Sequence, residues 1–180
     1  MKRVRLQTGD IILIPLSNSQ AALGQLVMLD LRPDAPLNPL LRVVKGVYDL
    51  KDFDLDKIDL TDELFPPIIT GVGGAVKTGY WYNVGNKPVD EFIFPKFVST
   101  NYNQDTGEAR GWWLNDGTGS YQIGKVLPDE YKKLEYRVVL SPADVAERII
   151  TGEVSWPYGD LIRYNKFTPK KDSNSNDMQD

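Results

Sequence analysis

The apolar residues of this 180-residue chain come in short runs that end at glycine, proline, asparagine or aspartate. The clearest run covers residues 11–16, which follow Gly9 and Asp10 and precede a Ser-Asn-Ser turn. An apolar run of this length between turn-forming residues is typical of a buried β-strand. The 15 Gly, 12 Pro and 19 aromatic residues (4 Trp, 9 Tyr and 6 Phe) favour the same β-rich interpretation.

The order of runs and turns predicts a mainly antiparallel sheet. Residues 11–16 and 21–29 form a predicted hairpin, because a loop of about four residues separates them. Turn signals at 103–107 and 115–119 predict a meander of the strands that flank them. Further strands are expected at 41–48, 68–76 (loosened by glycines), 80–84, 92–98 (an edge strand around Pro95), 112–114 and 121–126.

One helix is expected between Ser141 and Gly152. Ser141 is a suitable N-cap, Pro142 suits the first helical position, and Asp144 brings negative charge to the positive helix end. Gly152 can end the helix. The expected apolar stripe consists of Val145, Ala146, Ile149 and Ile150.

These elements predict a single α+β domain over residues 1–167. Its centre is a strongly bent antiparallel sheet, open or barrel-like, with one or two helices packed against it. The second, shorter helix is expected at 128–134. Residues 31–40 are expected to form a proline-rich surface loop, and residues 168–180 a disordered polar tail.

The absence of histidine and cysteine restricts the chemistry open to this chain. It excludes disulfides, thiolate metal sites, the common nucleophilic triads and most transition-metal sites. We therefore expect a protein that is not an enzyme and has no catalytic, cofactor-binding or metal-ligating residues. The alternative is a small enzyme that works with carboxylates, on a carbohydrate or through Mg²⁺, and Asp54 and Asp56 are placed to share one face of a strand.

Two local patterns imitate known segments. Residues 71–78 imitate a phosphate-binding loop, but Val76 stands where such a loop has glycine before its lysine, so we interpret them as a closely packed strand. The basic N-terminus imitates a signal peptide, but its apolar run is short and no cleavage pattern follows. No stretch approaches the roughly 20 apolar residues of a membrane-spanning helix, and no membrane partner is expected.

The net charge of −4 comes from one segment of the chain. Residues 49–63 hold seven acids and two lysines, a net charge of −5, whereas the rest holds 19 basic and 18 acidic residues. This segment is either a solvated loop or a patch that attracts the basic surface of a partner. Nucleic acid is disfavoured as a partner, because no basic excess is available to neutralise phosphates.

Pairs of adjacent aromatic residues are candidates for a binding surface. Trp112 and Trp113 are neighbours in one expected strand, so their side chains point to opposite faces. One of them is expected in a core, and the other is available to a second layer or a partner. Because tryptophan is enriched in binding hot spots, Trp81 and Trp113 are candidate interface residues.

Two blocks of sequence carry a family resemblance. The first is Gly-Asp-Ile at 9–11, Ile-Pro-Leu at 14–16 and Ala-Leu-Gly-Gln-Leu-Val at 22–27. The second is Gly-Tyr-Trp-Tyr-Asn-Val-Gly-Asn-Lys-Pro at 79–88, and the helix expected at 141–152 falls where the family has its C-terminal helix. On these residues the chain resembles the immunity protein 26 family of bacterial polymorphic toxin and contact-dependent inhibition systems. The loop at 31–40 and the acidic segment are longer than the family pattern, and the chain beyond Trp156 is not matched.

The resemblance implies a protein that binds and blocks a cognate toxin in the cytoplasm of the producing cell. It implies no catalytic residues and leaves the toxin's activity open; for a nuclease, the acidic segment would meet the phosphate-binding groove. A β-barrel module for peptide or nucleic acid is a further alternative, but it needs a basic groove. The expected toxin interface consists of Asp49, Asp52, Asp54, Asp56, Asp59, Asp62, Glu63, Trp81 and Trp113.

Overall fold

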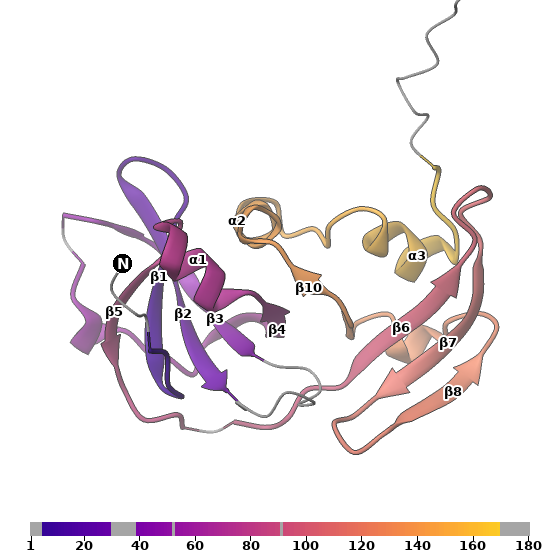
Figure 1. The fold of residues 1–180 in the computed structure, drawn as a ribbon, viewed down its shortest axis with the longest axis horizontal. Helices are drawn as coiled ribbons and strands as arrows, with labels where there is room; N and C mark the ends of the chain where they lie inside the picture. The colour runs from indigo at the N-terminus through magenta and orange to yellow at the C-terminus, as the bar shows by residue number, and fades with distance from the viewer. Residues whose placement is uncertain (1–4, 30–38, 52, 91, 170–180) are drawn as a thin grey trace, which may run out of the picture.

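Two open β-sheets and the helices between them make up the protein (Figure 1). The structure is a computed structural model that describes residues 5–29, 39–51, 53–90 and 92–169. The expected α+β class is confirmed, but neither sheet closes into a barrel. Most of the expected proline-rich loop, and the expected tail from residue 170 onward, lie outside the described residues.

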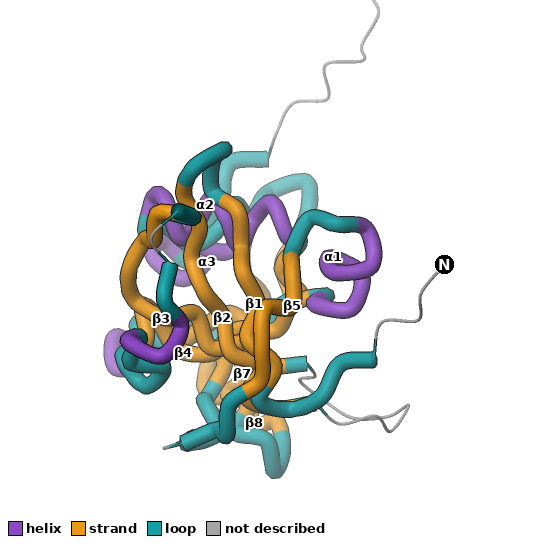
Figure 2. Tube along the Cα trace, turned by 90° about the vertical axis from the view of Figure 1, so that its left-hand side faces the viewer, coloured by secondary structure: helices purple, strands orange, loops and turns teal. Residues whose placement is uncertain are grey.

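The larger sheet has six strands, and Figure 2 shows β3, β2, β1 and β5 side by side. The expected hairpin is confirmed, since β1 and β2 pair antiparallel with Leu13 opposite Leu23. All neighbours are antiparallel except β10 and β4, which are parallel. In spatial order the strands are β10 (Val139–Leu140), β4 (Glu63–Thr70), β3 (Leu40–Asp49), β2 (Gln20–Met28), β1 (Asp10–Pro15) and β5 (Tyr82–Asn86).

The smaller sheet contains the expected meander. Its strands are β8 (Ser120–Gly124), β7 (Ala109–Asn115), β6 (Phe97–Tyr102) and β9 (Glu135–Tyr136), in that order. The edge strand expected at 92–98 is wrong, because β6 begins at Phe97 and has a neighbour on each side. Pro95 has no N–H to donate, and the strand begins only after it.

Helix α2 (Pro142–Thr151) begins and ends where the sequence predicts. The Ser141 side chain accepts from the Asp144 N–H at 3.2 Å, and Asp144 Oδ2 accepts from the Ser141 N–H at 3.1 Å, which completes a capping box. The expected apolar stripe is partly wrong, because Ile150 is 65% exposed whereas Arg148 is buried. The expected helix at 128–134 is reduced to a 3₁₀ turn at Asp129–Tyr131.

Helix α1 (Val72–Thr78) stands where a glycine-loosened strand was expected. Strand β4 ends at Thr70 instead, because Val72 and Ala75, three positions apart, both enter the core under the large sheet. Lys77 lies in the last turn of this helix, away from the phosphate-contacting helix start of a true phosphate loop. A third helix, α3 (Tyr158–Tyr164), was not predicted.

Apolar clusters join the two sheets to the helices and to each other. One cluster lies between the sheet and helices α1 and α2, and another lies between the small sheet and α3. Phe97 of β6 is fully buried beside Val27, Leu40 and Ile69 of the large sheet. The two sheets therefore meet through a shared apolar contact and are not independent.

Candidate functional site

The acidic segment is laid across the second face of the large sheet. Four apolar side chains of the segment, Phe53, Leu55, Ile58 and Leu60, pack against a buried cluster on β1, β2 and β3. Because these contacts hold the backbone in place, the segment is an ordered cover of the sheet. A short 3₁₀ helix spans Leu55–Lys57, and the Asp54 side chain before it accepts from the Asp56 N–H. The segment connects the end of β3 at Asp49 to the start of β4 at Glu63.

The described acids of the segment are exposed to solvent. We call this surface the acidic face; its described members Asp49, Asp54, Asp56, Asp59, Asp62 and Glu63 are all exposed, whereas Asp52 lies outside the described residues. Ion pairs join Lys57 to Asp54 at 2.9 Å, Lys87 to Asp56 at 3.0 Å and Arg42 to Glu63 at 3.8 Å. The Asp56 side chain is 90% exposed even so. The described acids that the sequence predicts for the interface are therefore all accessible to a partner.

Local hydrogen bonds keep two of these carboxylates charged. Donation from Lys57 lowers the pKa of Asp54, and donation from the side chain and backbone of Thr61 lowers the pKa of Asp59. A hydrogen bond to the ionised form of a carboxylate favours that form. The ionised forms of Asp54 and Asp59 are therefore favoured.

Two polar residues lie buried at one end of the face, where the strand pattern predicts apolar ones. Gln25 and Arg42 are cross-strand partners on β2 and β3, 0% and 3% exposed. Gln25 Nε2 donates to the carbonyls of Lys87 and Pro88 at 3.1 and 3.0 Å. Arg42 donates to the carbonyls of Leu60 and Asp90. Together they bind the acidic segment and the stretch after β5 to the sheet. Their sequence signal is one polar residue within each of the apolar runs 21–27 and 40–44.

The two candidate interface tryptophans, Trp81 and Trp113, lie in different environments. Trp81 is 2% exposed and belongs to the main core, so it is unavailable to a partner and is corrected from interface to core residue. Its neighbours Tyr80 and Tyr82 are 68% and 52% exposed. Trp112 is fully buried and Trp113 is half-buried, which confirms their opposite orientation. Trp113 lies on the small sheet, so the fold does not place it on the acidic face.

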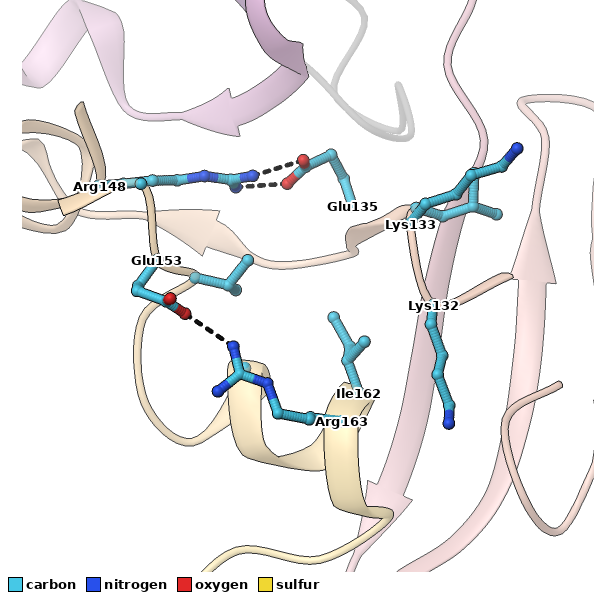
Figure 3. A pocket seen from close by; sticks show the side chains of 11 residues that line it. Lys132, Lys133, Glu135, Arg148, Glu153, Ile162 and Arg163 are labelled. Atoms are coloured by element: carbon cyan, nitrogen blue, oxygen red, sulfur yellow. Dashed lines mark hydrogen bonds and ion pairs between the residues drawn. The ribbon is translucent and has the colours of Figure 1, made fainter. Parts of the chain in front are cut away.

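A hollow of about 350 Å³ opens where α2, α3 and the entry to β9 meet (Figure 3). Its wall contains a buried bidentate ion pair between Arg148 of α2 and Glu135 of β9. The Arg148 guanidinium also lies 4.1 Å from the ring centre of Phe65 in β4. A second, exposed pair joins Arg163 to Glu153 at 2.9 Å.

Each carboxylate of this hollow already faces an arginine. Both carboxylates, Glu135 and Glu153, are therefore engaged in ion pairs. Among residues 5–29, 39–51, 53–90 and 92–169, no three His, Cys, Asp or Glu side chains group closely enough to hold a metal ion. Within the same residues, no helix has the length and apolar character to cross a membrane.

Tyr136, next to Glu135, makes stability depend on pH in the alkaline range. Its hydroxyl exchanges hydrogen bonds with the backbone of Thr100, and burial raises its pKa to about 12. The neutral phenol is thus favoured in the folded state. The contribution of the Tyr136 hydroxyl to the free energy of unfolding is fully present below its unfolded-state pKa near 10. This contribution is lost as the pH rises towards 12.

We expect the melting temperature to fall between pH 10 and about 12, and Tyr136→Phe to flatten that dependence. Thermal melts at intervals through this range measure it. Tyr121→Phe is the control, because Tyr121 is half exposed in β8. An equally steep fall in Tyr136→Phe contradicts the assignment.

Comparisons with protein-family models, with curated proteins and with solved structures find no match to this chain.

Proposed function

We propose that this chain is an immunity protein, which binds a cognate bacterial toxin through the acidic face and covers the toxin's active or substrate-binding surface. The observation that carries the proposal is the ordered presentation of the acids. Phe53, Leu55, Ile58 and Leu60 anchor the segment on the sheet, and the carboxylates between them face solvent.

Order and charge favour binding in different ways. A segment that is already fixed in the free protein loses little conformational entropy when a partner binds. A concentrated negative charge accelerates encounter with a basic surface and disfavours acidic partners. Both properties suit the inhibition of an enzyme whose substrate is an anion, such as a nuclease.

The test uses the toxin domain encoded beside this chain and a triple charge reversal. Asp49→Lys, Asp56→Lys and Asp62→Lys change exposed carboxylates without touching the apolar anchors. We expect the association rate at low salt to fall roughly tenfold or more, and its salt dependence to weaken. Stopped-flow or surface-based kinetics at several salt concentrations measures both, and growth of cells that express the toxin measures protection.

A matched control carries the same charge change elsewhere. Asp105→Lys, Glu130→Lys and Glu147→Lys alter exposed acids on the small sheet, its 3₁₀ turn and helix α2. We expect a much smaller change in association rate for this control, because these acids lie off the acidic face. If both triple variants bind and protect equally well, the acidic face is not the interface. If the unaltered chain does not bind the toxin, the proposed function is wrong.

A further inference from the structure

A small socket opens at the end of the acidic face beside the buried Gln25–Arg42 pair. Its volume is about 230 Å³, which suits a single side chain better than a cofactor. It lies between the acidic segment and the stretch that follows β5. Its polar lining includes Gln25, Arg42, Asp59, Lys87 and Asp90.

The side-chain oxygen of Gln25 is the unexplained group in this socket. Gln25 is 0% exposed, and within the described part of the chain its Oε1 accepts no hydrogen bond. The amide orientation is fixed, because the two carbonyls of Lys87 and Pro88 require the nitrogen on their side. A buried acceptor without a donor is costly, so this oxygen is a place where an incoming N–H would be favoured.

The cations of the socket already have partners. Arg42 donates to two backbone carbonyls and lies 3.8 Å from a Glu63 oxygen. Lys87 donates to the Leu55 carbonyl and to Asp56, both at 3.0 Å. Because Arg42 and Lys87 already have hydrogen-bond and ion-pair partners, the hydrogen-bond acceptors of the other polar lining residues outnumber the remaining donors.

Two exposed carboxylates supply that excess together with Gln25. Asp59 and Asp90 both line the socket, and both residues are exposed. Asp59 is held in its ionised form by Thr61. A ligand that fits must therefore be cationic and rich in hydrogen-bond donors.

We infer that the socket receives an arginine side chain of the protein partner, an inference that rests on the proposed function and names the contact that gives it specificity. The guanidinium is planar, is charged at all physiological pH values and carries five N–H donors. One guanidinium can donate to a carboxylate at the mouth of the socket and to the Gln25 amide oxygen at the same time. An ammonium group can donate to the same acceptors, but it lacks the fixed planar arrangement.

The first experiment tests the socket without the toxin. The ¹⁵N-labelled full chain is titrated with Nα-acetyl-arginine N-methylamide, while NMR follows the side-chain amide signals of Gln25. We expect a saturable shift with a dissociation constant on the order of millimolar, as suits one side chain. The citrulline analogue, which is neutral and nearly isosteric, is expected to give no saturable shift. If the arginine probe shifts the Gln25 amide signals no more than the citrulline analogue does, or if its shift does not saturate, the inference is overturned.

A matched pair of variants locates the contact. Asp90→Asn removes a charge at the mouth and leaves Gln25 and Arg42 intact, and Asp105→Asn removes one from a turn of the small sheet. We expect Asp90→Asn to weaken binding of the arginine probe roughly two- to fivefold, as for an exposed ion pair, and Asp105→Asn to leave it unchanged. Equal affinities in the two variants contradict the inference.

The same variants in complex with the toxin separate the inference from the proposed function. If the toxin binds and responds to the triple charge reversal, but Gln25 signals ignore the arginine probe, the socket is wrong and the immunity function stands. If the arginine probe shifts the Gln25 amide signals and Asp90→Asn weakens binding of the probe, but the toxin does not bind, the inferred arginine site stands and the immunity function is wrong.

Discussion

Replacing Arg148 with alanine is expected to lower the free energy of unfolding by about 3–5 kcal/mol, because it leaves the Glu135 carboxylate buried without its counter-ion. Both side chains of the pair are 6% exposed. The pair also links β9 of the small sheet to α2, which packs on the large sheet, so its loss affects the contact between the two sheets. Urea denaturation followed by tryptophan fluorescence measures the change.

Two further variants make this prediction specific. Arg163→Ala breaks the exposed pair with Glu153 in the same hollow and is expected to lower the free energy of unfolding far less, because solvent screens exposed ion pairs. The double variant Arg148→Met, Glu135→Leu removes both charges and is expected to recover much of the lost stability. If Arg148→Ala costs no more than Arg163→Ala, the buried pair does not have the role assigned to it.

The second large effect is expected at Trp112. This side chain is fully buried under the small sheet, and its Nε1 donates to Asn165 Oδ1 at 2.6 Å. Its ring also meets that of Tyr136 edge to face, with centroids 6.3 Å apart. Trp112→Ala is therefore expected to lower the free energy of unfolding by about 3–5 kcal/mol.

The neighbouring residue provides the control. Trp113 is half-buried on the opposite face of β7, so Trp113→Ala removes much less buried area. We expect a loss of roughly 1 kcal/mol or less, the usual range for positions away from a core. Equal losses in the two variants would show that the strand does not present its two tryptophans as described.

The acidic face illustrates how far the sequence leads toward a site. The seven acids between residues 49 and 63 form a local charge excess that is evident from the order of residues alone. The apolar residues among them fit no regular period, and the structure shows why. They reach the sheet from a mostly irregular backbone with a short helix at Leu55–Lys57. Periodicity therefore had no long regular element to detect.

Buried polar residues were outside the reach of sequence analysis. Arginine, glutamate and glutamine are usually exposed, so Arg148, Glu135 and Gln25 had no reason to be placed inside. Their burial depends on partners that the fold supplies. Glu135 and Arg148 come from different elements, and Gln25 bonds carbonyls that are more than sixty positions away. Sequence spacing carries no record of such contacts.

Local signals alone determined much of the secondary structure. The capping residues of α2, the β1–β2 hairpin and the meander of β6 to β8 depend on residues within a few positions of one another, and each was predicted. Tertiary packing decided the rest. It turned the glycine-rich residues after Thr70 into helix α1, because Val72 and Ala75 gain more from the core than the glycines lose in helix propensity. It also divided the strands into two open sheets and laid the acidic segment over one of them, because burial of apolar faces is a property of the whole chain.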